Sequence, residues 1–104
     1  MNRIKWLEKW YQRNCNGEWE HFYGIEIGTL DNPGWYVKID LAETKHGDLQ
    51  MNEINIDRGE NDWMRCSVEN GIFQGYGDCT KLDDIIQTFM NWADPINSIN
   101  EETI

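Results

Sequence analysis

The spacing of hydrophobic residues changes along the chain from a helical period to an alternating one and back. Residues 3–14 have the helical period, with Asn2 in the capping position and Asn16-Gly17 as the stop signal. The side chains expected on the inner face of this helix are Ile4, Leu7, Trp10 and Tyr11. Four basic residues lie on its outer side.

From Trp19 onward the period is two, which predicts strands. The first two are expected over 19–28 and 35–41, joined at Asn32-Pro33-Gly34-Trp35, where proline second and glycine third predict a type II turn. The later predicted strands are 49–57, with a bulge between Met51 and Ile54, then 63–68, and 72–76 after a hairpin turn at Asn70-Gly71.

The last third of the chain returns to the helical period. A loop is expected at 75–78, Thr80 is expected to cap a second helix, and Pro95 to end it. Its predicted apolar stripe is Leu82, Ile85, Ile86, Phe89 and Ala93. The fold class is therefore α+β: an antiparallel five-stranded meander sheet flanked by an N-terminal and a C-terminal helix packed on one face. We expect one domain over residues 1–95 and a flexible tail over 96–104.

Composition supports a folded core and an acidic surface. The 104 residues are 39% hydrophobic and include six tryptophans, whose large rings supply core area that a short chain otherwise lacks. Nine basic and nineteen acidic residues give a net charge of −10, and because residues 1–17 carry +3, the remainder carries −13. Such a field repels nucleic-acid phosphates and anionic membranes and attracts basic proteins, although it also serves solubility.

Catalytic and cofactor motifs are sparse. The three cysteines form no metal-binding pattern, and their odd number indicates free thiols in a reducing, cytoplasmic setting. Cys79 precedes the second helix, but neighbouring aspartates favour its neutral thiol. His21 beside Glu20 is the other candidate for acid–base chemistry. Structural roles are expected for all of these, and no cofactor or metal is predicted.

Two segments combine large aromatic residues with acids or a turn: the block 17–25, and the run Thr29-Leu30-Asp31-Asn32-Pro33-Gly34-Trp35. Together with the Trp6-Leu7 and Trp10-Tyr11 pairs, they resemble the opening of the bacterial immunity protein 53 family. The similarity continues through Asp62-Trp63, the segment 75–77 and the last helix, and so covers nearly all of 4–94. Structural parts of the motif are expected to be Trp19, Asn32, Pro33, Gly34 and Trp35.

The resemblance implies an immunity protein, encoded beside a polymorphic or contact-delivered toxin, that binds the toxin tightly. We expect it to act by occluding the active site or substrate surface of the toxin. From the charge we expect a basic toxin domain, such as a nuclease, as the partner, and neither nucleic acid nor membrane. The candidate toxin-binding residues are Glu18, Glu20, Asp31, Tyr36, Asp57, Glu60, Asp62, Tyr76 and Asp78. Two alternatives stay open: a small cysteine- or histidine-dependent enzyme, since some relatives carry a rhodanese-like label, and a general acidic adaptor or nucleic-acid mimic.

Overall fold

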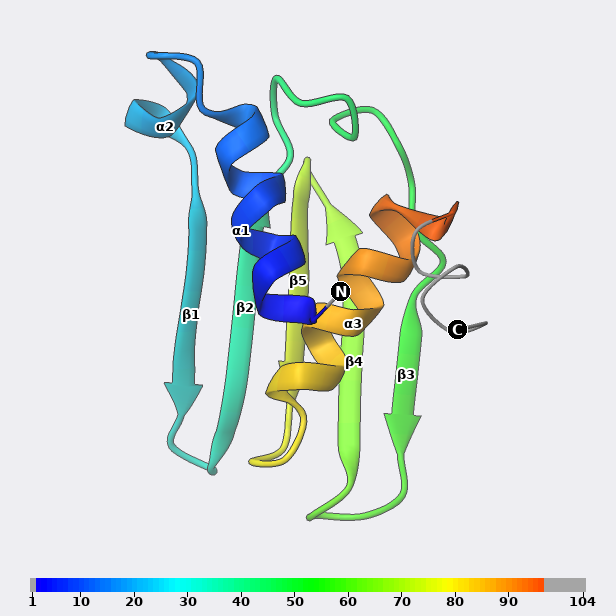
Figure 1. Cartoon of the computed structure of the whole chain (residues 1–104). Helices are drawn as coiled ribbons and strands as arrows, with labels where there is room; N and C mark the ends of the chain where they lie inside the picture. Colours follow the sequence, from blue (N-terminus) through cyan, green and yellow to red (C-terminus); the bar gives the residue numbers. More distant parts are fainter. Residues whose placement is uncertain (1, 97–104) are drawn as a thin grey trace.

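The computed structural model describes residues 2–96 and shows an open sheet of five antiparallel strands with helices on one face (Figure 1). In chain order the elements are α1 (Arg3–Asn14), α2 (Trp19–Phe22), β1 (Ile25–Leu30), β2 (Gly34–Asp40), β3 (Ile54–Asp57), β4 (Trp63–Glu69), β5 (Ile72–Gly77) and α3 (Leu82–Ala93). The predicted α+β class is confirmed. The expected tail lies outside the described residues, except for Ile96.

Helix α1 begins as predicted but turns a different side toward the core. The Asn2 side chain accepts a backbone hydrogen bond from the first turn at 2.7 Å. The side chains that the helix buries are Trp6, Leu7 and Trp10. Ile4 is 50% exposed and Tyr11 39% exposed, so their predicted place on the inner face was wrong. The helix packs against α3 as well as the sheet, and Trp6 meets Phe89 there edge to face.

The strand predicted over 19–28 was wrong in its first half. Residues 19–22 form the short helix α2, and β1 begins only at Ile25. The side-chain oxygen of Asn16 accepts two backbone N–H groups at the start of this turn, both at 2.9 Å. These local bonds satisfy the backbone without a partner strand. Trp19 is fully buried, and its indole N–H donates a hydrogen bond to the backbone carbonyl of Ala42, in the loop after β2.

The hairpin β1–β2 is confirmed, but its turn is not the predicted type II turn. The Asn32–Pro33 peptide bond is cis, and Gly34 already pairs with Leu30 in the ladder without a positive φ. A type II turn needs positive φ at its glycine. Glycine is required here for space instead, since a Cβ at this position would lie closer than 3.0 Å to the carbonyl oxygen of Gly77.

The strands lie side by side in the order β1-β2-β5-β4-β3. Strands β3, β4 and β5 form a meander, and β1 and β2 form a hairpin. The sequential order of a full meander breaks between β2 and β3, because β2 pairs with β5 instead. The connection 41–53 carries the chain to the far edge of the sheet (Figure 1). The strand expected over 49–57 with a bulge was wrong for 49–53, because this stretch bonds to α3 instead of a ladder: the Trp92 indole donates to the Gln50 carbonyl at 3.0 Å.

The hairpin at Asn70-Gly71 is confirmed, with φ of 54° and 74° at the two turn residues. The loop predicted at 75–78 was wrong for its first three residues, which continue β5. A Cβ at Gly75 would lie closer than 3.0 Å to Cγ2 of Ile85 in α3. The glycine therefore marks a close approach of helix and strand and not a turn.

Helix α3 ends at Ala93, before Pro95 as predicted, but it is not capped as predicted. Lys81 occupies the N-cap position, and the Thr80 hydroxyl donates to the Asp78 carboxylate at 2.6 Å. Asp78 therefore organises this end of the helix, and the expected Thr80 cap was wrong. The side chains that α3 buries are Ile85, Ile86, Phe89 and Met90, of which the first three belong to the predicted stripe.

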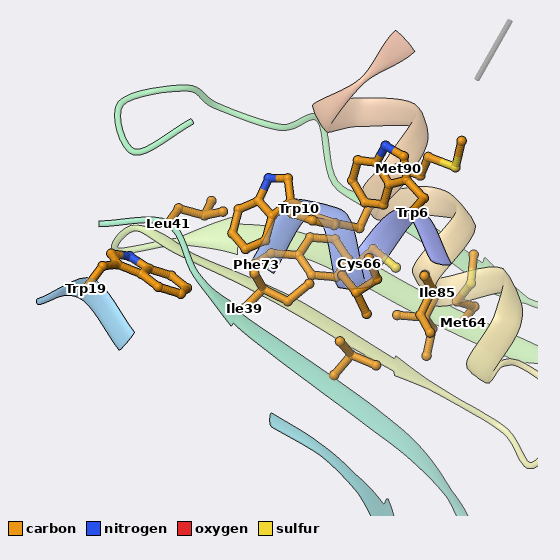
Figure 2. Close-up of a cluster of buried hydrophobic side chains, with 14 residues drawn as sticks. Trp6, Trp10, Trp19, Ile39, Leu41, Met64, Cys66, Phe73, Ile85 and Met90 are labelled. Atoms are coloured by element: carbon orange, nitrogen blue, oxygen red, sulfur yellow. The ribbon is translucent and has the colours of Figure 1, made fainter. Parts of the chain in front are cut away.

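Aromatic rings fill the space between the sheet and the helices (Figure 2). The Phe89 ring lies 5.0 Å from Phe73, 5.2 Å from Trp10 and 5.6 Å from Trp6, measured between centroids. Trp10 also meets Trp19 edge to face at 6.0 Å. Contacts of this kind add to the area that the rings bury. The core lies entirely on the helix side of the sheet, so the opposite side chains face outward.

Candidate functional site

The sheet face opposite α1 and α3, called the open face below, carries a row of large polar and aromatic side chains. Directly paired residues point to the same side of a sheet. The ladder pairs Gly28 with Tyr36, Tyr36 with Tyr76, Tyr76 with Arg65, and Arg65 with Asn55. This row therefore crosses all five strands. It brings together the two tyrosines that were predicted as toxin-binding residues, Tyr36 and Tyr76.

A hollow of about 460 Å³ opens on this face over β5, β4 and β3. Its walls include Leu30, Asn55, Asp57, Trp63, Arg65 and Tyr76. Trp63, Tyr76 and Leu30 are half-buried, whereas Arg65 and Asn55 are exposed. The hollow thus combines an apolar floor with charged groups at its margin, as binding pockets commonly do.

Tyr36 is held in place beside the hollow. Its ring covers Gly28, where a Cβ would overlap the ring atoms, and its hydroxyl donates to the Glu26 carboxylate. This hydrogen bond, with burial and the nearby negative charge, raises the pKa of Tyr36 above its usual value. The Lys38 ammonium lies 5.7 Å from the ring centroid. The ring is therefore fixed in one position and half-buried.

Four of the predicted acidic residues gather at one end of the sheet. Asp31 lies in the β1–β2 turn, Asp57 ends β3, and Glu60 and Asp62 lie in the loop before β4 (Figure 1). Glu60 lines both the hollow on the open face and a second hollow of about 340 Å³ between these loops. Asp31, Asp57 and Glu60 are exposed. We call these three, with Asp62, the acidic end.

Asp78 was expected in an exposed loop, and this was wrong: it is 3% exposed. Its carboxylate accepts hydrogen bonds from the backbone of Trp63 at 2.8 Å, from the backbone and hydroxyl of Thr80, and from the Lys81 ammonium at 2.9 Å. Burial alone would raise its pKa, but these hydrogen bonds outweigh burial and hold the pKa of Asp78 well below its usual value. Asp78 thereby links the start of β4 to the loop before α3.

Asp62 shares the same lysine. Its carboxylate lies 2.8 Å from the Lys81 ammonium and 3.6 Å from the Arg58 guanidinium. The hydrogen bond from Lys81 is the main reason why the pKa of Asp62 is lowered. The Lys81 side chain is only 13% exposed, and its bonds to the two carboxylates raise its own pKa. The charge of Asp62 is therefore already matched within the chain.

The remaining two predicted acids lie at the other end of the molecule, around α2 (Figure 1). Glu18 is exposed. The Glu20 carboxylate accepts the backbone N–H groups of Asn16 and Gly17, both at 2.9 Å. The pKa of Glu20 is lowered by hydrogen bonds from backbone N–H groups, first its own and then those of Asn16 and Gly17. Glu20 thus closes the turn before α2, and the structure does not bring this pair close to the acidic end.

The groups considered for catalysis lie apart from one another. Cys66 is buried under α3, and burial raises the pKa of its thiol to about 12, which disfavours the nucleophilic thiolate. Cys15 and Cys79 are free thiols in separate loops. His21 is exposed in α2. Among residues 2–96, no group of three or more histidine, cysteine or carboxylate side chains is arranged to hold a metal ion.

The residues expected to be structural hold the fold at two points. The Trp19 indole anchors α2 to the loop after β2, and the Trp35 indole donates to the Cys79 carbonyl at 3.0 Å. This second bond joins the β1–β2 hairpin to the loop before α3. Asn32 and Pro33 are exposed at the hairpin tip, where both line the second hollow. The hairpin tip therefore lies beside Glu60 of the acidic end.

Sequence reasoning missed Trp63, Arg65 and Leu30 as residues of a site. A signal was present in β4, because alternation over 63–68 puts Met64, Cys66 and Val68 on one side of this strand. The intervening residues then lie on the other side, and a tryptophan there is unusual for a face that meets only water. Leu30 carried no such signal, since only strand pairing brings it close to β4.

A comparison with protein-family models identifies the chain. The model described as Immunity protein 53 matches residues 4–94. The chain belongs to the immunity protein 53 family. The resemblance drawn from the aromatic and turn motifs is confirmed, and so is the implied role of an immunity protein whose partner is a toxin. Curated proteins and solved structures gave no match.

Within residues 2–96, no helix combines the length and the apolar character that crossing a bilayer requires.

Proposed function

We propose that this immunity protein neutralises its toxin by stoichiometric binding, in the cytoplasm of the cell that makes both, and that the bound chain covers the active site or substrate surface of a basic toxin domain. The observation that carries this proposal is the open face with the acidic end beside it. A nuclease is the class of toxin that best fits, because a protein that grips phosphates presents a basic surface.

The distribution of charge favours this side of the molecule. The basic residues of α1 lie on the helix side, where Lys9 and Arg13 are exposed. These two positive charges disfavour a basic partner at this end of α1. On the open face and the acidic end, Asp31, Asp57 and Glu60 are exposed, and none of the three forms an ion pair with another described residue. Complementary charge steers a partner to this side and speeds association.

The size of the surface also supports the proposal. Five strands spaced about 4.8 Å apart and about six residues long cover roughly 500 Å² in plan. With the acidic end added, the area approaches the roughly 800 Å² that each partner buries in a standard protein complex. The aromatic and arginine side chains at its centre, Tyr36, Trp63, Arg65 and Tyr76, are of the types that dominate binding energy in such interfaces.

Binding and protection test the proposal together. The toxin domain encoded beside this chain is co-expressed with it, separated in denaturant and refolded. We expect a one-to-one complex by light scattering, and loss of toxin activity in proportion to the amount of chain added. Inhibition at a small fraction of one equivalent would indicate that the chain modifies or destroys the toxin catalytically, and would overturn the stoichiometric mechanism.

A charge-reversal pair tests the steering. Asp57→Lys with Glu60→Lys should slow association with the toxin domain several-fold and weaken its dependence on salt, while dissociation changes less. The matched control is Glu43→Lys with Asp48→Lys, which changes the net charge equally in exposed positions of the loop at the other end. Stopped-flow association at low and physiological ionic strength is the measurement. Equal slowing in both pairs would mean that only the total charge matters.

A further inference from the structure

We infer that the hollow on the open face is an anchor pocket, and that it receives one large apolar side chain of the toxin domain, presented from a surface rich in lysine and arginine. This inference rests on the proposed function and adds to it the place and the chemistry of the central contact.

The floor of the hollow calls for an apolar group. Leu30 comes from the edge strand β1 and Trp63 from β4, and Tyr76 lies between them on β5. All three are half-buried with no helix above them. A concave apolar surface that a partner can cover completely is where interfaces place the side chain that contributes most to binding. Covering it removes aromatic surface from water.

Two residues that line the hollow, Trp63 and Arg65, also carry hydrogen-bond donors. Buried or half-buried indoles usually find an acceptor. The indoles that do so within the chain are those of Trp6, Trp19, Trp35 and Trp92. Among residues 2–96, the indoles of Trp10 and Trp63 donate no such hydrogen bond, and of these two only Trp63 lines the hollow. The Arg65 guanidinium forms no ion pair with another described residue. Both donors in the hollow suit the backbone carbonyl groups that flank an inserted side chain.

The margin of the hollow specifies what surrounds that side chain. Asp57 and Glu60 line the hollow and are exposed. Asp62, close by, is matched by Lys81 and Arg58, but no described residue forms an ion pair with Asp57 or Glu60. These two carboxylates outnumber the one unpaired cation among the described residues that line the hollow, Arg65, so its margin fits an apolar residue flanked by basic ones. An acidic or uncharged partner surface would leave them desolvated without compensation.

The pocket is preformed, so binding need not order it. Its walls stand on paired strands, and the Tyr76 hydroxyl is held by the Gln74 side chain at 3.2 Å. Tyr76 also has Tyr36 and Arg65 as its direct cross-strand neighbours. Rigid aromatic walls lower the entropic cost of association.

Filling the hollow tests the inference while keeping the native side chains of Leu30, Trp63 and Tyr76. Asn55 is exposed on the edge strand β3 and lines the hollow, and tryptophan is well accepted in strands, so Asn55→Trp should fold normally while its ring occupies the pocket. The matched control is Gln12→Trp, the same kind of change at an exposed position of α1 on the other side of the molecule. Melting temperatures of both variants verify folding.

We expect Asn55→Trp to raise the dissociation constant for the refolded toxin domain about 100-fold, chiefly through faster dissociation, and Gln12→Trp to leave it within about twofold. In the wild-type complex, nuclear Overhauser effects should connect methyl or aromatic protons of the toxin to the Trp63 indole, whose signal is identified from a Trp63→Phe sample.

Three results would overturn the inference. Wild-type affinity in Asn55→Trp would show that the toxin does not enter the hollow, while leaving the immunity mechanism intact. Overhauser effects from polar toxin groups alone would show that the occupant is not apolar. If sedimentation showed that the chain self-associates through this face and that Asn55→Trp abolishes only that association, the occupant would be a second copy. A wild-type chain that fails to bind the toxin domain at all would instead refute the proposed function.

Discussion

Replacing Gly75 by alanine should destabilise the protein by about 2 kcal/mol. The new Cβ would lie closer than 3.0 Å to Cγ2 of Ile85, which is fully buried in α3. Strand β5 is hydrogen-bonded on both sides, to β2 and β4, so its backbone cannot retreat. Extra volume in a packed core costs about 1–3 kcal/mol. A loss of 2 kcal/mol corresponds to a fall of roughly 8–16 °C in melting temperature for a domain of this size.

A double variant identifies the cause. Ile85→Leu removes Cγ2 but keeps the volume and should cost less than about 1.5 kcal/mol by itself. Adding Gly75→Ala in that background should then cost less than half of what it costs in the wild type. Gly24→Ala is the control, because no atom lies within 4 Å of its added Cβ and its φ is ordinary. That variant should be neutral or more stable by about 0.4–1 kcal/mol.

Urea unfolding followed by tryptophan fluorescence measures all four variants. If Gly75→Ala matched Gly24→Ala, or if the losses in the double variant were simply additive, the close approach of α3 to β5 would not be what requires glycine. The added methyl group points to the helix side, so folded Gly75→Ala should bind the toxin domain as tightly as the wild type.

Three further outcomes are expected. Gly34→Val should lower the free energy of unfolding by about 1–3 kcal/mol, because its side chain would meet the carbonyl oxygen of Gly77; an unchanged urea midpoint would refute this. Burial lowers the pKa of His46, so the folded state prefers the neutral imidazole. The contribution of this preference to the free energy of unfolding is complete above about pH 6.5 and is lost as the pH falls below that value. Thermal melts between pH 8 and 5.5 should show this loss in the wild type and not in His46→Phe. Cys79→Ser should protect fully against the toxin, whereas Cys66→Ser should lower stability by placing a hydroxyl in the core. A folded Cys79→Ser that failed to protect would revive the cysteine-dependent enzyme as an explanation.

The order of importance among the acidic residues follows from their partners. Asp78 and Asp62 are bound to Lys81, so replacing either perturbs the loops as well as the surface. Asp57 and Glu60 have no such bond to a lysine or arginine among residues 2–96, which makes them the positions at which binding and folding can be separated. Effects on the toxin are therefore best sought at these two.

The sequence alone determined features that depend on near neighbours. Asn2 caps α1, Asn70-Gly71 forms a two-residue turn, and the periods of 3.6 and two place α1, α3 and most of the strands. Each is fixed by residues a few positions apart. The aromatic and turn motifs likewise sufficed for the family, since they can be read without knowing what they touch.

Only the tertiary structure decided which residues meet across the sheet. β5 pairs with β2, and this non-local pairing brings Leu30 into one hollow with Trp63 and Tyr76. It also places Gly75 under a helix instead of in a loop. Local pattern does not encode such pairings, because the alternation of each strand is satisfied equally by any neighbour that buries the same face. The open face and its hollow arise from that choice of neighbour.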